Sequence, residues 1–163
     1  MNRRTACMLT TMTLFGLMTV ALPEVGFAQS SPLIGTWKLN LEKSNFIPGT
    51  APRSQTASFQ QDGQNIKNTN QTIDAKGNAT TTVFMHIYDG QPHPTTGNPL
   101  YDASAYLRLD GNTVVYSRFK DGKLVQIGTI VVSQDGKSRT NTTTGMVDPN
   151  GLTGTTVSVY DKQ

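Results

Sequence analysis

The chain has 163 residues, few charged side chains and a small positive excess, with 14 Lys and Arg against 11 Asp and Glu. Its cations are scattered singly, so the sequence has no basic stripe of the kind that nucleic acid or an anionic membrane surface requires. A single cysteine, Cys7, excludes a disulfide within the chain.

The N-terminal residues have the pattern of an export signal. Two arginines precede an apolar run from Ala6 to Leu22, and Gly26-Phe27-Ala28 places small residues where a signal peptidase reads them. We expect residues 1–28 to be a signal peptide cleaved after Ala28, and the mature chain to be periplasmic or secreted. A membrane anchor is the weaker alternative, because the run is shorter than the roughly 20 apolar residues of a spanning helix.

Removal of residues 1–28 leaves 29–163, a length that suits one domain. Arg3, Arg4 and Glu24 leave with the signal, so 12 cations and 10 acids remain and the net charge is +2. Cys7 leaves too. The mature domain must therefore be held together by its core and its strand ladders.

The mature sequence is typical of β-strands. It is rich in Thr, Ser, Asn, Gln, Val and Gly, and Asp-Gly or Asn-Gly pairs fall between segments of strand length. This spacing predicts about nine strands, within a range of 8–10. They are expected near 33–41, 54–61, 64–73, 78–88, 101–110, 112–120, 123–133, 137–146 and 154–161.

Short connections predict that strands next to each other in sequence pair in space. A meander of this kind has exposed edges unless it closes, so we expect an all-β fold: a single antiparallel up-and-down β-barrel. A two-sheet sandwich is the alternative, but its longer crossovers have no obvious place among such short turns.

Alternation predicts which residues share a face of each strand. The apolar sets are Leu33, Gly35, Trp37, Leu39 and Leu41, then Val83, Met85 and Ile87, then Tyr101, Ala103, Ala105, Leu107 and Leu109. Residues 124–132 are apolar on both faces, which predicts deep burial. Residues 137–146 are polar on both faces, which predicts an edge strand or a wet interior.

Two segments do not have the pattern of hairpin turns. Residues 42–52 contain Pro48-Gly49 and are expected to form a short turn or lid after the first strand. Residues 89–99 contain three prolines, which fix φ and remove backbone donors. We expect this second loop to be stiff, to stay out of the ladders and to form part of the rim of the barrel mouth.

The Gly35-Thr36-Trp37 motif on the first strand, placed after a signal peptide and before a meander, resembles the lipocalin and calycin superfamily. The fuller pattern, with Lys43-Ser44, Tyr88-Asp89-Gly90 and Thr96-Gly97-Asn98-Pro99, looks like a group of small exported bacterial proteins of unknown function. The resemblance implies that Gly35 and Trp37 form the plug at the closed end.

In that superfamily an arginine near the end of the last strand packs across the tryptophan. No arginine follows Tyr160 here. The nearest cation in sequence is Lys162, and Arg139 lies one strand earlier. The Thr-Asp-Tyr motif of the superfamily and its C-terminal helix are absent as well.

The residues that carry chemistry are few. His86 and His93 have no spacing that makes a metal site, and no cofactor motif is present, so we expect neither a metal nor a cofactor. His86 either lines the lumen or is a hydrogen-bonded structural histidine. Most aspartates precede Gly or Pro in turns and have a turn role; Asp102 is the least turn-like.

Arg108 and Arg118 each lie within a strand, opposite the more apolar alternation, and the turn between their strands is expected to bring them close together. If that face is the lumen, the two guanidinium groups can grip a carboxylate or phosphate. If it is the outer face, they are solvated charges with packed stems. Tyr88, Tyr106 and Tyr116, with Phe84 and Phe119, either form a pocket wall or pair across the sheet.

Three functions remain open at this point. The first is the binding of a small apolar or amphipathic ligand in the lumen, with Arg108, Arg118, His86, Tyr88, Tyr106 and Tyr116 as candidate contacts. The second is an enzyme that uses His86 or Asp102 with Arg108. The third is a structural or interaction module of the cell envelope with a filled lumen. The size and lining of the lumen distinguish the three.

Overall fold

The computed structural model describes residues 31–148 and 150–163, and these residues form ten β-strands and no helix. The strands are β1 (Gly35–Asn45), β2 (Ser54–Asp62), β3 (Asn65–Ile73), β4 (Ala79–His86), β5 (His93–Pro94), β6 (Ala103–Arg108), β7 (Thr113–Lys120), β8 (Lys123–Val132), β9 (Ser138–Met146) and β10 (Thr153–Lys162). The predicted signal peptide and its cleavage site lie outside the described residues. Within those residues, no helix has the length and apolarity needed to cross a membrane.

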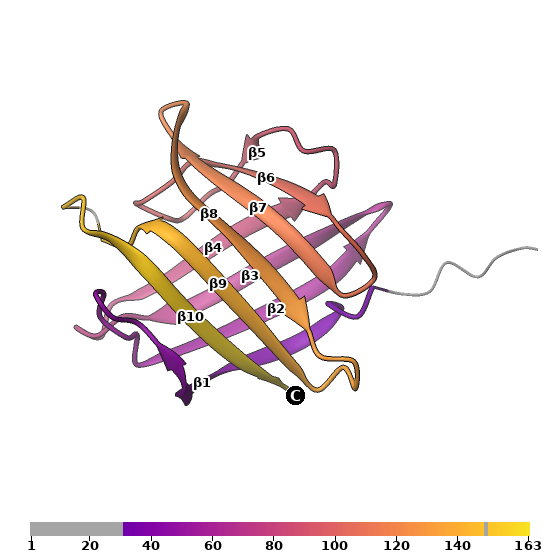
Figure 1. Cartoon of the computed structure of the whole chain (residues 1–163), viewed down its shortest axis with the longest axis horizontal. Coiled ribbons are helices and arrows are strands. Elements are labelled where there is room, and N and C mark those ends of the chain that lie inside the picture. Colours follow the sequence, from indigo (N-terminus) through magenta and orange to yellow (C-terminus); the bar gives the residue numbers. More distant parts are fainter. Residues whose placement is uncertain (1–30, 149) are drawn as a thin grey trace, which may run out of the picture.

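All strand pairs are antiparallel, and the sheet order is β4-β3-β2-β1-β10-β9-β8-β7-β6-β5. Strands that follow each other in sequence are therefore neighbours in the sheet, except β4 and β5, which are its two ends, and β1 also pairs with β10. The sheet coils so that β7 to β10 cross in front of β2 to β4 (Figure 1). The predicted all-β, antiparallel up-and-down barrel is confirmed.

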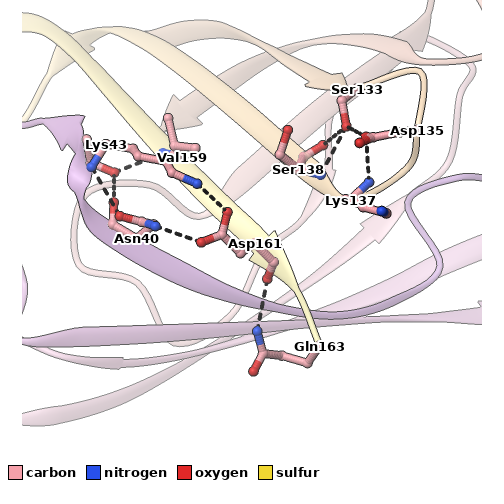
Figure 2. A network of polar contacts seen from close by, with 10 residues as sticks. Asn40, Lys43, Ser133, Asp135, Lys137, Ser138, Val159, Asp161 and Gln163 are labelled. Atoms are coloured by element: carbon pink, nitrogen blue, oxygen red, sulfur yellow. Dashed lines mark hydrogen bonds and ion pairs between the residues drawn. The ribbon is translucent and has the colours of Figure 1, made fainter.

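Pairing of β1 with β10 joins the two ends of the described chain. Trp37 lies opposite Lys162 and Leu39 opposite Tyr160. Figure 2 shows Asp161 between the amide of Asn40, at 2.6 Å, and the ammonium of Lys43, at 3.1 Å. This contact between side chains reinforces the backbone ladder where the barrel closes.

The opposite seam, between β4 and β6, is closed by an irregular segment. Its two-residue strand β5 pairs with β6, and Thr96 exchanges two backbone hydrogen bonds with Val83 of β4, at 3.0 and 3.2 Å. The expectation that residues 89–99 stay out of the ladders was therefore wrong. Its prolines do lack donors, but the amides of Thr95 and Thr96 supply the bonds instead.

Glycines decide how closely this segment approaches its neighbours. Gly97 has φ +80°, and a Cβ built there would lie 1.8 Å from the carbonyl oxygen of Thr81. The hydroxyl of Thr82 donates to the Gly97 carbonyl at 3.3 Å. Only a residue without a side chain fits between this turn and the β4 backbone.

The predicted inner faces were correct for Trp37 and Leu39 of β1 but wrong for Leu41, which is exposed, and wrong for β4 and β6. Trp37 and Leu39 are buried, whereas on β4 the buried side chains are Thr82, Phe84 and His86 instead of the apolar set at 83, 85 and 87. On β6 the inner side chains are Ser104 and Tyr106, and Leu107 faces outward. Tyr101, which precedes β6, is the member of the predicted set that does lie in the interior. Apolar alternation misled here because the interior of this barrel is largely polar and aromatic.

The structure also tests the predictions for β8, which is apolar on both faces, and β9, which is polar on both faces. β8 buries Ile130 and Val132 but exposes Ile127 and Val131, so deep burial on both faces was wrong. β9 lies between β8 and β10. It is therefore no edge strand, and the wet-interior alternative is the one that the structure supports.

Replacement of Gly97 by Ala tests the seam, with Gly90→Ala as a matched control. Both glycines have positive φ, but a Cβ at Gly90 meets nothing within 4 Å. Gly90→Ala should cost about 1 kcal/mol of unfolding free energy for the backbone strain alone. Gly97→Ala should cost about 3 kcal/mol or more, because β4 must also move. Urea unfolding measures both, and equal losses would contradict this account of the seam.

Candidate ligand cavity

A cavity of about 600 Å³ occupies the barrel interior. Its deeper wall includes Tyr101, Arg118 and Tyr160, and its outer wall includes the exposed residues Thr50 and Lys76. The cavity therefore opens at the end of the barrel where the loops after β1, β3 and β9 lie. The buried side chains of Trp37, Phe59 and Ile66 form the core toward the other end.

Arg118 is held firmly on the cavity wall. Its guanidinium carbon lies 4.5 Å from the ring centres of both Tyr101 and Tyr116, and 5.4 Å from that of Phe84. Nη1 donates to the side-chain oxygen of Gln126 at 2.9 Å. Gln126 in turn donates to the carbonyl of Met146, which fixes its orientation. The aromatic rings and the amide position the cation without neutralising it.

The rest of the wall is rich in hydroxyl and amide groups. Tyr101 accepts a hydrogen bond from the amide of Asn98 at 2.9 Å, and Tyr160 donates to Gln55. Burial raises the pKa of both tyrosines, so each keeps its hydroxyl proton at neutral pH. These groups form fixed donors and acceptors along a cavity that also has aromatic surface.

Gly128 on β8 allows a side-chain hydrogen bond between the strands on its two sides, β7 and β9. Tyr116 on β7 forms a hydrogen bond with the hydroxyl of Thr143 on β9, passing over Gly128 on β8. A Cβ at Gly128 would lie 2.5 Å from the end of the Tyr116 ring. The missing side chain therefore allows the ring that contacts Arg118 to take this position.

A second guanidinium, that of Arg139, is buried deeper in the barrel. It lies 3.9 Å from the Tyr160 ring, 4.8 Å from Phe59 and 5.6 Å from Trp37. Burial lowers its pKa to about 10, which leaves it charged at neutral pH. Arg139 thus packs across the tryptophan from one strand before the position that the lipocalin resemblance implies.

Trp37 is fully buried at this end of the barrel, and its indole nitrogen donates to the Leu33 carbonyl at 2.8 Å. Lys162 also approaches the indole, with Nζ 5.1 Å from the ring centre. A Cβ at Gly35 would lie 3.0 Å from the Lys162 side chain. Both residues of the expected plug therefore lie in a tightly packed region.

The charges in the interior are not balanced by acids. Neither Arg118 nor Arg139 takes part in an ion pair with a described residue. The one carboxylate on the cavity wall, among the described residues, is Asp74 at the rim. Asp74 accepts hydrogen bonds from its own turn, from Lys76 and Asn78. The cavity consequently has a positive interior.

Several buried polar atoms near these arginines have no partner among the described protein atoms. They are Nε of Arg118, Nε and Nη2 of Arg139, and Oδ1 of Asn141, which also lines the cavity. Buried polar groups are almost always hydrogen-bonded. Two of these atoms, Nε of Arg118 and Oδ1 of Asn141, belong to residues that line the cavity, which indicates that something with polar groups enters it, whether solvent or ligand.

The six candidate contacts from the sequence form one row of ring and guanidinium contacts, in which only His86 and Tyr106 are stacked face to face. Successive ring or guanidinium centres are 4.5, 6.1, 3.9, 6.1 and 4.5 Å apart. The row runs Arg108, Tyr88, His86, Tyr106, Tyr116, Arg118. Only its last member lines the cavity described above, with Tyr116 directly behind it.

Arg108 and Arg118 are not neighbours, contrary to the prediction. In the β6–β7 ladder Arg108 pairs with Val114, and Arg118 pairs with Ser104 at the other end. Arg108 is exposed and contacts Ser31 at 3.3 Å. The register places both arginines on the inner face, but only Arg118 lines the cavity, whereas Arg108 lies at the other end of the barrel and is exposed.

The residues named for an enzyme do not share a site. His86 is buried and stacked on Tyr106, with ring centres 3.9 Å apart. Asp102 lies at the surface, where it pairs with Lys120 at 3.4 Å. His93 contacts Asp89 at 2.9 Å, within its own loop.

Sequence reasoning missed most of the cavity wall. Gln126, Asn98, Tyr101 and Tyr160 were not singled out, because amides and tyrosines in strands have many roles. One usable signal was present. The polar pattern of residues 137–146 predicted either an edge strand or a wet interior, and Asn141 and Thr143 of that segment line the cavity.

No family model matches the chain, and none of the curated proteins matches it in sequence. Among solved structures, it is similar to zebrafish ileal bile acid-binding protein complexed with cholic acid. The TM-score is 0.51 and the identity 16%, over 82% of this chain and all (100%) of that one. A redesigned β-barrel, mFAP1, bound to DFHBI has a TM-score of 0.44 and 12% identity, over 81% of this chain and 95% of that one. The first similarity supports the antiparallel β-barrel fold.

Acid should destabilise the protein through His86. Burial, reinforced by the charges of Arg139, Arg118 and Arg108, lowers the pKa of His86 from 6.5 to about 3. Between these values the unfolded chain binds a proton that the folded one does not, so stability falls as pH decreases, by up to about 1.4 kcal/mol per pH unit. His86→Phe should remove this slope between about pH 6.5 and about pH 4.5, whereas His93→Gln should keep it. Urea unfolding at several pH values tests this, and an unchanged slope in His86→Phe would contradict it.

Proposed function

We propose that the protein is an exported barrel that binds a small amphipathic anion in its lumen, with the negative group of the ligand at Arg118. The observation that carries this proposal is a positioned guanidinium on the wall of a cavity that has no interior carboxylate. The cavity volume, about 600 Å³, is within the range of small-molecule sites.

The energetics of a buried cation favour this function. A charge that leaves bulk water costs several kcal/mol unless it is paired, and aromatic rings supply only part of that compensation. A carboxylate, sulfonate or phosphate at Arg118 forms charge-assisted hydrogen bonds, which are about twice as strong as neutral ones. Tyr101, Tyr116 and Gln126 already hold the guanidinium in place, so little side-chain entropy is lost when the anion binds.

The lining refines the class of ligand. A carrier of purely apolar molecules would have a mostly apolar wall, whereas amides and hydroxyls from Gln55, Asn70, Asn98 and Thr143 lie among the aromatic rings here. The ligand should therefore have one anionic group, some apolar or aromatic surface and further groups that form hydrogen bonds. This favours the amphipathic alternative over the apolar one.

The other two functions have less support. An enzyme requires titratable groups within hydrogen-bond reach of each other and of a substrate, and His86, Asp102 and Arg108 lie in three separate places. A structural module with a filled lumen does not account for the cavity or for the orphaned atoms beside it.

Arg118→Met tests the proposal with two fluorescent probes, anilinonaphthalenesulfonate and its uncharged analogue phenylnaphthylamine. We expect the sulfonate to bind about 10-fold to 100-fold more weakly to the variant, because a charge-assisted hydrogen bond contributes about 1.5 to 3 kcal/mol. Binding of the neutral probe should change little. Fluorescence titration gives all four dissociation constants.

Arg108→Met is the matched control, because Arg108 also lies in a strand but outside the cavity. It should leave both affinities unchanged. Arg118→Lys keeps the charge and should recover part of the sulfonate affinity, which separates loss of charge from loss of fold. Equal sulfonate affinity in Arg118→Met and the unsubstituted protein would overturn the proposal.

Export rests on the sequence pattern of residues 1–28. Expression of the full chain in a bacterium should give a periplasmic or secreted protein that begins at Gln29. Intact-mass measurement of the fractionated protein checks both points. A cytoplasmic product that retains residues 1–28 would count against export, without affecting the ligand hypothesis.

A further inference from the structure

The outer face of β6, β7, β8 and β9 lacks charged side chains along its ladders. The charged residues of these strands are either on the inner face or at strand ends: Arg108, Arg118, Lys120, Lys123 and Arg139. Apolar and hydroxyl side chains occupy the outward positions between them. We refer to this surface as the β6–β9 face.

Large apolar side chains are exposed on the β6–β9 face. Leu107 is 48% exposed, Ile127 50% and Val131 42%. Between them runs a shallow groove of about 530 Å³, lined by Leu107, Val115 and Ile127 and bordered by Thr142 and Thr144. An exposed apolar surface that is continuous over several strands usually marks an interaction site.

We propose that the β6–β9 face binds the same face of a second copy of this chain. The distribution of charge favours this partner. Two copies with a net charge of +2 each repel, and this face can approach its equivalent without bringing like charges together. An acidic partner or an anionic membrane surface would lose solvation on this face and gain no ion pair.

The size of the face sets the expected affinity. Four strands about 4.8 Å apart and about eight residues long, at about 3.3 Å per residue, cover on the order of 500 Å². Two copies would bury on the order of 1,000 Å² in total, which is near the lower limit of specific interfaces. The dimer should therefore be reversible, with a dissociation constant on the order of 10 to 100 µM.

A twofold arrangement suits this surface. Sheets that pack face to face lie about 10 Å apart, with side chains of one sheet between those of the other. In a symmetric dimer the residue Ile127 of each copy can enter the groove of the other, beside Leu107 and Val115. The lumen opens at the end of the barrel, so this contact leaves the ligand cavity accessible.

Sedimentation velocity of the mature chain, from about 5 µM to about 500 µM, tests the proposal over the range expected for a weak interface. The unsubstituted protein should shift from monomer to dimer within this range. Ile127→Lys should stay monomeric throughout, because two buried ammonium groups would face each other. Ile73→Lys is the matched control: Ile73 is 42% exposed on β3, outside the β6–β9 face, and its variant should dimerise like the unsubstituted protein.

Thermal unfolding of each variant, at a concentration where all are monomeric, verifies that Ile127→Lys is folded. If it is not, Leu107→Thr provides a milder second variant, since threonine already occupies neighbouring outward positions. A protein that remains monomeric at the highest concentration would overturn the proposal. So would a dimer that tolerates both substitutions on the β6–β9 face.

Discussion

Two positively charged guanidinium groups lie inside the barrel, and their positions determine what the cavity can bind. Arg118 and Arg139 are surrounded by aromatic rings, and no described carboxylate reaches either of them. Cation–π contacts and one amide oxygen keep these groups in place, but they do not cancel the charge. Under the proposed function, an anion bound at Arg118 would compensate this unpaired, preorganised charge, and occupancy of the cavity would then stabilise the fold.

The way the barrel closes determines where this charge lies. Pairing of β1 with β10 leaves a seam between β4 and β6, which an irregular segment fills instead of a full strand. That segment leads directly into Asn98 and Tyr101, and Tyr101 contacts the guanidinium of Arg118. Gly97 lets this segment approach the backbone of β4, and Gly128 lets the ring of Tyr116 cross β8. The cavity wall around Arg118 is thus built at the part of the barrel where regular strand pairing stops.

Much of the fold could be predicted from the sequence, and much of the site could not. Asp-Gly pairs such as Asp121-Gly122, where both residues have positive φ, fixed the hairpins and hence the meander. The prediction of which strand face points inward failed on β4 and β6, because the rule that apolar residues point inward presumes an apolar interior. In this barrel His86 and Tyr106 point inward, while Leu107 and Ile127 point outward. Residues of the cavity wall come together only through strand register, which local sequence does not specify.

Native mass spectrometry of the protein purified from the cell envelope tests the central claim most directly, since it asks what accompanies the unpaired guanidinium. The account predicts a bound small molecule that carries negative charge, is released on unfolding and is absent from the Arg118→Met variant purified in the same way. A neutral lipid retained equally by both proteins would contradict it. So would an empty barrel whose melting temperature no carboxylate, sulfonate or phosphate raises.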